Sequence, residues 1–230
     1  MFKNNPRFSL VVFAALIITS CTNAPKSNDA TVTEPQAVAN NESANAVPLD
    51  LAGSQITWIG TKVAGRHNGI IEFSSGNFMM KDGDIIGGDL FINMETLRAV
   101  DMDEKGNSNL TGHLKSEDFF DVGNHPSAKF EITKVVVYDE NIHATTEEVD
   151  PEFSITNPTH MISGNLEIKG ISKNITFPAD IKVGNGRMKA AAKFNINRMD
   201  WDVKYAGKPD DLISEIVHLG FTVGTVTPGS

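Results

Sequence analysis

Apolar and polar side chains alternate with a period of two in five segments of this chain, and this pattern constrains its fold more than any other feature. Successive side chains of a β-strand point to opposite faces, so such a pattern is typical of strands with one buried face. The apolar faces comprise Ile86, Gly88, Leu90, Ile92 and Met94; Ile162, Gly164, Leu166 and Ile168; Ile175, Phe177, Ala179, Ile181 and Val183; Met188, Ala190, Ala192, Phe194 and Ile196; and Val217, Leu219, Phe221 and Val223. Residues 55–62, 68–74, 76–80 and 127–138 alternate less regularly and are also predicted to be strands.

Two dipeptides between these segments favour tight hairpin turns. Asp82-Gly83 and Asn185-Gly186 suit turns that need positive φ, so neighbouring strands are predicted to be antiparallel. No long helical pattern interrupts the strands, which disfavours a wound parallel sheet. The fold class is therefore predicted to be all-β, an antiparallel barrel or sandwich.

One short helix is predicted over residues 110–120, near one mouth of the barrel. Leu110 and Leu114 are four residues apart, and Ser116 precedes two acidic residues as an N-cap would. The polar segment 139–158 contains two prolines and is predicted to be a loop insertion, to which no role is assigned.

Small residues occupy several inward positions, which indicates missing volume inside a barrel. Gly88, Gly164, Ala190 and Ala192 each lie among larger apolar residues. An eight-stranded barrel is only just filled by side chains, so small ones leave room for a ligand. The alternative is that the glycines mark bulges or strand coiling. The pattern across several strands favours an apolar cavity, which would take a long apolar ligand.

The N-terminus has the layout of an export signal followed by a lipidation site. Lys3 and Arg7 precede an apolar stretch, residues 10–18, that is too short to span a bilayer. The next residues, Ile18-Thr19-Ser20-Cys21, resemble the lipobox of bacterial lipoproteins, which implies cleavage before Cys21 and acylation of this single cysteine. Thr22 after the cysteine resembles outer-membrane sorting, so the domain is expected to face the periplasm. The alternative is an ordinary signal peptide with a stray cysteine.

The expected mature chain is strongly acidic. Without Lys3 and Arg7 it keeps 18 basic and 29 acidic residues, a net charge of −11, which disfavours nucleic acid as a partner. Residues 22–47 lack aromatic residues and periodicity, and they are rich in Asn, Ala, Thr, Ser, Glu and Pro, so a disordered linker is predicted. The expected organisation is a signal peptide (1–20), a lipidated cysteine with a linker (21–47) and one barrel domain (48–230).

Several motifs resemble those of a known family. They are Trp58, GRHNG (65–69), Ser75-Gly76, Gly87-Gly88, HLKSEDFFDV (113–122), HPSAKF (125–130) and GNLEIKGISKNITFP (164–178). In this order and spacing, over residues 49–226, they resemble the YceI-like family, also called polyisoprenoid-binding proteins. The resemblance implies a lipocalin-like, up-and-down antiparallel β-barrel that holds an isoprenoid or other long-chain lipid, such as a quinone precursor or a polyprenyl phosphate. It implies no catalytic residue, and it leaves the oligomeric state open, a dimer included.

The predicted inward faces and the predicted mouth indicate which residues would meet such a ligand. Those expected to line the tunnel are Trp58, Phe73, Phe78, Gly88, Leu90, Ile92, Phe119, Phe120, Phe130, Gly164, Leu166, Phe177, Ala190, Ala192, Phe194 and Phe221. A polar head group would meet Arg66, His113, Lys115 or Asp118. The alternative for His113 and Asp118 is capping and hydrogen bonding that fix the helix over the barrel, and Phe119 and Phe120 could serve only as packing.

Two other function classes stay open. One is a metal-dependent envelope hydrolase that uses His113 and Asp118, although the six histidines show no HExxH or other close ligand spacing and the chain has no GxSxG motif. The other is an interaction barrel without ligand, which predicts a filled core and an exposed apolar patch. A polar group after one strand, residues 195–202, indicates a turn or a second mouth, and the turn is favoured.

Overall fold

The structure is a computed structural model, and it describes residues 24–38, 44–184 and 187–226. Cys21, the expected export signal and the predicted Asn185-Gly186 turn lie outside the described residues. Among the residues described, no helix has the length and apolarity needed to cross a membrane.

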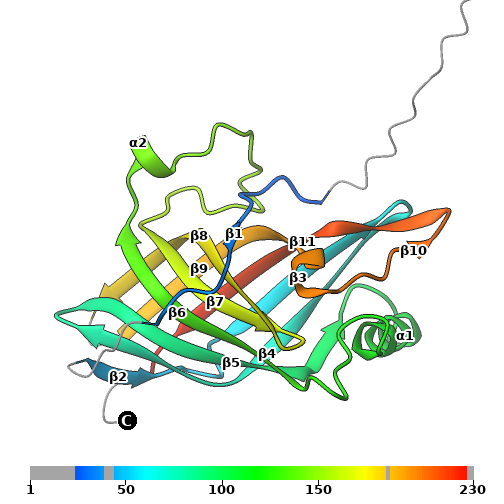
Figure 1. Cartoon of the computed structure of the whole chain (residues 1–230), viewed down its shortest axis with the longest axis horizontal. Coiled ribbons are helices and arrows are strands. Elements are labelled where there is room, and N and C mark those ends of the chain that lie inside the picture. The colour runs from blue at the N-terminus through cyan, green and yellow to red at the C-terminus, as the bar shows by residue number, and fades with distance from the viewer. Residues whose placement is uncertain (1–23, 39–43, 185–186, 227–230) are drawn as a thin grey trace, which may run out of the picture.

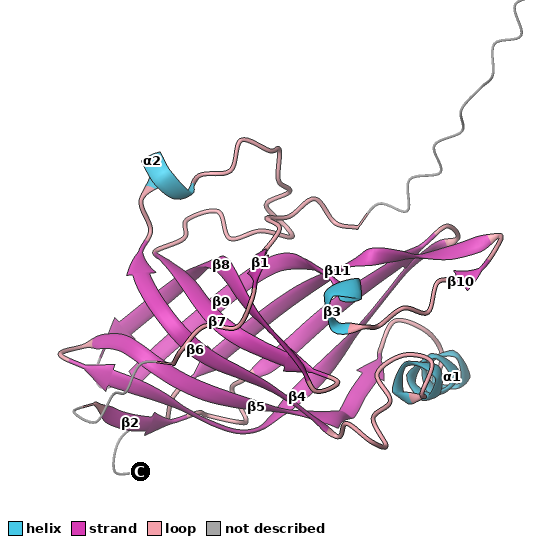
Figure 2. Ribbon diagram, viewed as in Figure 1, coloured by secondary structure: helices cyan, strands magenta, loops and turns pink. Residues whose placement is uncertain are grey.

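Eight strands close into an antiparallel barrel, which confirms the predicted fold class (Figures 1 and 2). They are β3 (Gln55–Lys62), β4 (Gly65–Lys81), β5 (Asp84–Ala99), β6 (Ser127–Val137), β7 (His160–Ile168), β8 (Ile171–Gly184), β9 (Arg187–Asn197) and β11 (Asp211–Gly224). From β3 to β9 each pairs with the next along the chain, and β11 closes the barrel because it pairs with both β9 and β3. Asp82 and Gly83 have the predicted positive φ values, 53° and 95°, in the turn between β4 and β5.

The predicted inward faces form the core, with two corrections. On β5 the inward residue is Ile85, which is buried, whereas Ile86 is half-buried. Met79 pairs with Gly87 and Met80 with Ile85, so Ile86 is the extra residue of a β-bulge, and a bulge reverses the alternation on either side of it. Val183, near the end of β8, is 48% exposed and does not belong to the core.

The helix forms six residues earlier than predicted. Helix α1 (Glu104–Lys115) begins at Asp103, whose side chain accepts a hydrogen bond from the amide of Gly106, and it ends at Ser116. Ser116 is therefore the C-cap and not the N-cap, and the acidic residues after it lie outside the helix. The first half of α1 contains glycine, asparagine and serine, which are weak helix formers, so helix propensity did not indicate that the helix begins there.

The predicted linker is wrong for its described residues, because they pack on the barrel. Strand β1 (Thr31–Thr33) pairs with residues 174–176 of β8, and β2 (Asn45–Pro48) pairs with β4. β8 pairs with β9 only from Ala179 onward, and residues 28–33 fill the seam where the two strands separate. We call residues 24–38 the N-terminal strap. Its polar composition indicated disorder, but its backbone hydrogen bonds to β8 and β9 hold it in place.

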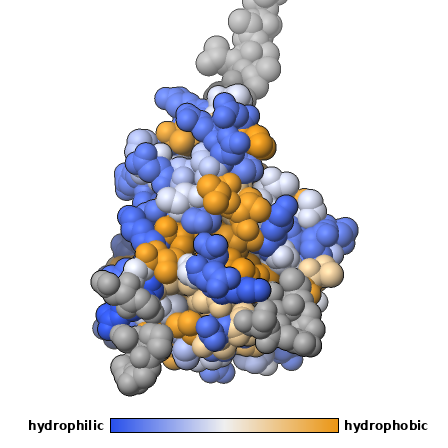
Figure 3. Space-filling model, turned by 90° about the vertical axis from the view of Figure 1, so that its left-hand side faces the viewer, coloured by the Kyte–Doolittle hydropathy of each residue, from blue (hydrophilic) through white to orange (hydrophobic). Residues whose placement is uncertain are grey.

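The segment between β6 and β7 packs against the strap. It contains α2 (Glu140–His143), and farther on the Asp150 amide donates to the carbonyl of Lys26 (2.8 Å) while the Ser27 hydroxyl donates to the carbonyl of Phe153 (2.5 Å). The remaining elements are η1 (Arg198–Trp201), a 3₁₀ turn, and β10 (Gly207–Lys208). The barrel end away from α1 shows apolar surface among polar side chains (Figure 3), and Val137 and Ile142 are each 74% exposed.

Candidate functional site

A cavity of about 180 Å³ lies inside the barrel next to α1. Such a volume is far larger than the roughly 10–15 Å³ that a single buried water requires. The wall of the cavity is mainly apolar, and its apolar residues come chiefly from β3, β4, β5, β7 and β11, including Ile56, Ile71, Ile92, Met94, Leu97, Leu166, Ile168, Val217 and Leu219. An apolar cavity of this kind favours the burial of hydrocarbon.

Helix α1 and the turn after it cover the mouth of the cavity. Leu110, His113 and Leu114 of the helix line it, and so do Phe119 and Phe120 of the turn. The His113 ring meets Phe119 edge-on at 5.2 Å between centroids and Tyr205 at 4.7 Å. We call Phe119 and Phe120 the lid, because they lie between the cavity and the outside of the barrel end.

The barrel half away from α1 is filled by aromatic rings. Phe177 and Phe194 stack at 4.2 Å between centroids, and Phe221 meets both edge-on. Phe130 lies over Gly164, because a Cβ built on that glycine would be 2.3 Å from the Phe130 Cζ atom. Ring atoms therefore occupy the volume that Gly164 indicated, and the cavity described above is a pocket next to α1.

Only part of the predicted tunnel set lines the cavity. Trp58, Ile92, Phe119, Phe120 and Leu166 line it. The others lie in the filled half or elsewhere in the wall: Phe73, Phe78, Gly88, Leu90, Phe130, Gly164, Phe177, Ala190, Ala192, Phe194 and Phe221. Gly88 leaves no empty volume, since its φ is 151° and a Cβ there would be 2.6 Å from the carbonyl oxygen of Asn77.

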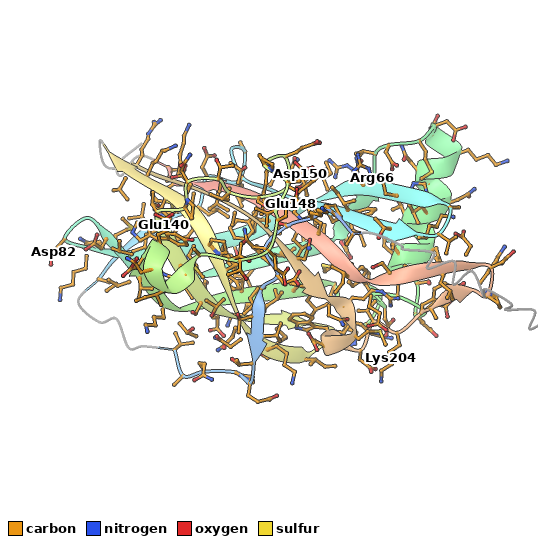
Figure 4. All side chains as sticks on the ribbon, turned by 90° about the horizontal axis from the view of Figure 1, so that it is seen from above. Arg66, Asp82, Glu140, Glu148, Asp150 and Lys204 are labelled. Atoms are coloured by element: carbon orange, nitrogen blue, oxygen red, sulfur yellow. The ribbon has the colours of Figure 1, made fainter. Side chains whose placement is uncertain are left out.

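Of the four predicted head-group residues, only His113 lines the cavity. The Arg66 guanidinium lies 5.5 Å from the ring centroid of Phe153, over the outer surface that also carries Glu148 and Asp150 (Figure 4). The Lys115 ammonium donates to the carbonyl of Glu95 at 2.5 Å, and Asp118 is exposed. His113 lines the cavity and Asp118 does not, so the structure does not bring to one site the two residues that the hydrolase alternative uses.

The cavity wall also holds polar side chains, and of these the sequence reasoning predicted only Trp58 and His113. Trp58 Nε1 and Thr61 Oγ1 are, among the described residues, the buried side-chain nitrogen and oxygen atoms without a hydrogen-bond partner. Thr61 and its neighbour Lys62 both line the cavity, which simple alternation forbids. β11 pairs with β3 through a register shift between Ile213 and Val217 at this level, and sequence alternation gives no sign of that shift.

Arg198 is the buried charged side chain of the cavity wall, with 4% of its surface exposed. Its Nε donates to the carbonyl of Ser214 (2.9 Å), Nη1 to that of Val203, and Nη2 to that of Ile213 (3.4 Å). Burial lowers the pKa of Arg198, and the charge of Glu215 opposes this shift. The sequence placed Arg198 in a turn, and the turn is η1, but only the tertiary structure brings its guanidinium to the cavity.

The described residues contain no cluster of three or more His, Cys, Asp or Glu side chains that could hold a metal ion. The two histidines of the cavity wall are already engaged by neighbours. His67 Nδ1 lies 3.0 Å from Asp101 Oδ2, and His113 packs between Phe119 and Tyr205. What the arrangement can do is enclose an apolar group under a lid, with a few polar side chains at one end.

Comparisons with known proteins agree with this architecture. The model of the YceI-like domain matches residues 48–224. The fold is similar to that of BcnA from Burkholderia cenocepacia, with 14% identity, 77% of this chain and 99% of that chain covered, and a TM-score of 0.52. It is also similar to a polyisoprenoid binding domain from Saccharophagus degradans implicated in plant cell wall breakdown, with 12% identity, 80% and 99% covered, and a TM-score of 0.53.

At these identities the two structures establish the fold, and the domain match establishes the family. No curated protein matches the sequence. The matched region begins at Pro48, so the N-terminal strap precedes the family domain and is an addition to it. Because the domain model covers most of the chain, this protein belongs to the YceI-like family.

Proposed function

We propose that this protein binds one amphipathic lipid, an isoprenoid or another long-chain compound, in the cavity under the lid, and that it carries, stores or sequesters this lipid in the cell envelope. The observation that carries the proposal is the apolar wall of the cavity, to which Phe119 and Phe120 belong. The fold relative from Saccharophagus degradans is described as a polyisoprenoid binding domain, which supports the same ligand class. The exposed position of Asp118, outside the cavity that His113 lines, favours binding over hydrolysis.

The size of the cavity limits how a long chain is accommodated. A cavity of about 150 Å³ holds a ring the size of benzene, so about 180 Å³ holds only a short segment of an isoprenoid chain. The rest of such a chain must pass the lid or displace the aromatic rings around Phe177. Each buried CH₂ contributes roughly 0.8 kcal/mol, and therefore chain length controls affinity until the available volume is full.

Lipidation of Cys21 and location at the outer membrane, facing the periplasm, are part of this proposal. The strap changes the geometry expected for the anchor. Cys21 lies three residues before Ala24, the first residue of the strap, so a short segment and not a long disordered linker would join the proposed anchor to the barrel.

Extraction of the protein purified from its native host, followed by mass spectrometry of the organic phase, tests the binding function. We expect a lipid in stoichiometric amount from the wild-type protein and a strong reduction from Val217→Phe, which fills the cavity. Val137→Phe is the matched control, because the same change is made on a strand residue that is 74% exposed. Repeated extracts without lipid from the wild-type protein would refute the proposal.

A second experiment separates anchoring from binding. Cys21→Ser should move the protein from the membrane to the soluble fraction and leave its lipid content unchanged. If the variant loses both its membrane association and its lipid, the proposal that the anchor and the barrel act independently is wrong.

A further inference from the structure

The polar residues that line the cavity carry no negative charge, although the chain as a whole has a net charge of −9. None of the described lining residues is an Asp or Glu, and the polar ones besides Trp58 are Thr61, Lys62, His67, His113, Arg198 and Ser214. The acidic residues that the structure describes therefore lie outside the cavity wall. A wall with cations and hydrogen-bond donors but no acid favours an anion over a cation.

Two of these basic side chains have acidic partners. The Lys62 ammonium lies 2.5 Å from a carboxylate oxygen of Asp211, and the His67 ring lies 3.0 Å from Asp101. Both have little attraction left for a charged ligand.

Arg198 differs from them because its three acceptors are neutral backbone carbonyls. A guanidinium has five N–H donors, so two of them remain after these bonds. Glu215 influences Arg198 only at longer range, and its carboxylate accepts a hydrogen bond from the side chain of Asn197 at 3.2 Å. A buried charge without a counterion is costly, and a ligand anion in the cavity would offset that cost.

Trp58 and Thr61 add hydrogen-bonding capacity toward the same ligand. The indole Nε1–H is a donor only, and it is buried in the cavity wall without an acceptor. The Thr61 hydroxyl is buried there in the same way. An unsatisfied buried donor destabilises the protein by itself, so both groups indicate that oxygen atoms of a bound ligand complete the site.

We propose that the cavity selects amphipathic ligands with an anionic head group, a carboxylate or a phosphate, that Arg198 neutralises and that Trp58 and Thr61 hydrogen-bond. This inference rests on the proposed lipid-binding function and names the ligand class. The Arg198 guanidinium lies 5.8 Å from the ring centroid of Phe119, which places the head group just under the lid. The hydrocarbon chain then extends along the apolar wall near Ile71 and Ile92 or out past the lid.

The test compares three ligands with the same chain and different head groups: palmitate, hexadecyl phosphate and hexadecanol. Each displaces a fluorescent fatty-acid probe from delipidated protein. A charge-assisted hydrogen bond is about twice as strong as a neutral one, so we expect at least one of the two anions to bind about tenfold or more tightly than hexadecanol. Which anion binds better distinguishes a fatty-acid source from a phosphate source.

Variants of Arg198 and Thr61 test whether these residues cause the preference for anionic head groups. Arg198→Met removes the charge at similar length and should abolish the preference for anions, whereas Arg198→Lys should retain part of it. Because Arg198 also holds three carbonyls, circular dichroism must show that the Arg198 variants fold. Thr61→Val keeps the shape of the side chain, disturbs no hydrogen bond of the free protein, and should weaken binding of the preferred anion about threefold or more.

Three results would overturn the head-group proposal. Equal affinity for all three ligands, or tighter binding of hexadecanol, refutes it and leaves the lipid-binding function intact. An anion preference that persists in a folded Arg198→Met variant shows that Arg198 is a structural residue only. If none of the three ligands binds and native extracts contain no lipid, the proposed function fails as well.

Discussion

His218 provides a direct test of how the strap is held on the barrel, through the pH dependence of stability. The ring is buried, with 4% of its surface exposed, although its strand position points away from the barrel interior. Nδ1 lies 3.0 Å from Asn195 Oδ1, and Phe153 covers the ring edge-on at 5.6 Å between centroids. The Asn195 amide nitrogen in turn donates to the carbonyl of Pro25 (3.1 Å), so His218 lies in the network that fastens the strap.

Burial, helped by the positive charge of Lys193, lowers the pKa of His218 from 6.5 to about 4. The unfolded chain therefore binds the proton more tightly than the folded protein, and the free energy of unfolding falls as pH decreases from about 6.5 to about 4. One pKa unit corresponds to about 1.4 kcal/mol, so the total loss is about 3 kcal/mol. About 2 kcal/mol of it falls between pH 7 and pH 5.

Urea denaturation followed by tryptophan fluorescence at pH 7 and pH 5 measures this loss. With a urea dependence of about 1–3 kcal/mol per molar, the midpoint should decrease by about 1 M more in the wild-type protein than in His218→Gln, which can still donate to Asn195. The lowered pKa values of Asp202 and Asp211 keep their titration below 3.8, outside this window. Equal pH dependence of the two proteins would refute the argument from burial.

Three further changes test other parts of the structure. Gly69→Ala should lower the free energy of unfolding, measured by urea denaturation, by about 3 kcal/mol. The reason is that the new Cβ would lie 2.0 Å from the carbonyl oxygen of Arg98 and 2.4 Å from the Trp58 ring. A loss below about 0.5 kcal/mol would contradict this close approach. Asp103→Ala removes the N-cap of α1 and should cost about 1 kcal/mol, seen as faster amide exchange in the first turn of α1 and not in the barrel strands. Val32→Asp places a charge where the strap packs against the core and should release the strap, seen as faster proteolysis of residues 24–38 while the barrel stays resistant.

The barrel was largely predictable because its signal is local. Alternation along one strand depends only on which face is buried, and the inward residues from Ile162 to Ile168 and from Met188 to Ile196 follow it without exception. Alternation failed at Ile86, where a bulge adds one residue. The helix prediction failed at the start of α1, where the N-cap outweighed the weak helix propensity of the residues that follow it. The prediction of a disordered linker failed in the strap, where a polar sequence is ordered by hydrogen bonds to strands far away in the chain.

The candidate site was harder to predict, because it depends on volumes between strands. Small residues indicated empty space, but rings from other strands fill most of it, as Phe130 does over Gly164. No pattern in one segment reports where a ring from a neighbouring strand will lie. Arg198 was missed for a related reason, since a turn residue reaches the cavity only when β11 and the loop at Val203 bring three carbonyls around it.

The sequence by itself determined that this protein is an antiparallel barrel of the YceI-like family, because alternation, turn dipeptides and motif order are properties of contiguous residues. Only the tertiary structure decided that the interior holds a pocket under a lid, that the strap closes a seam between β8 and β9, and that Arg198, hydrogen-bonded to three backbone carbonyls, lines the pocket. These features arise from packing and hydrogen bonding between residues that the barrel brings together. Such interactions are fixed only when the barrel closes.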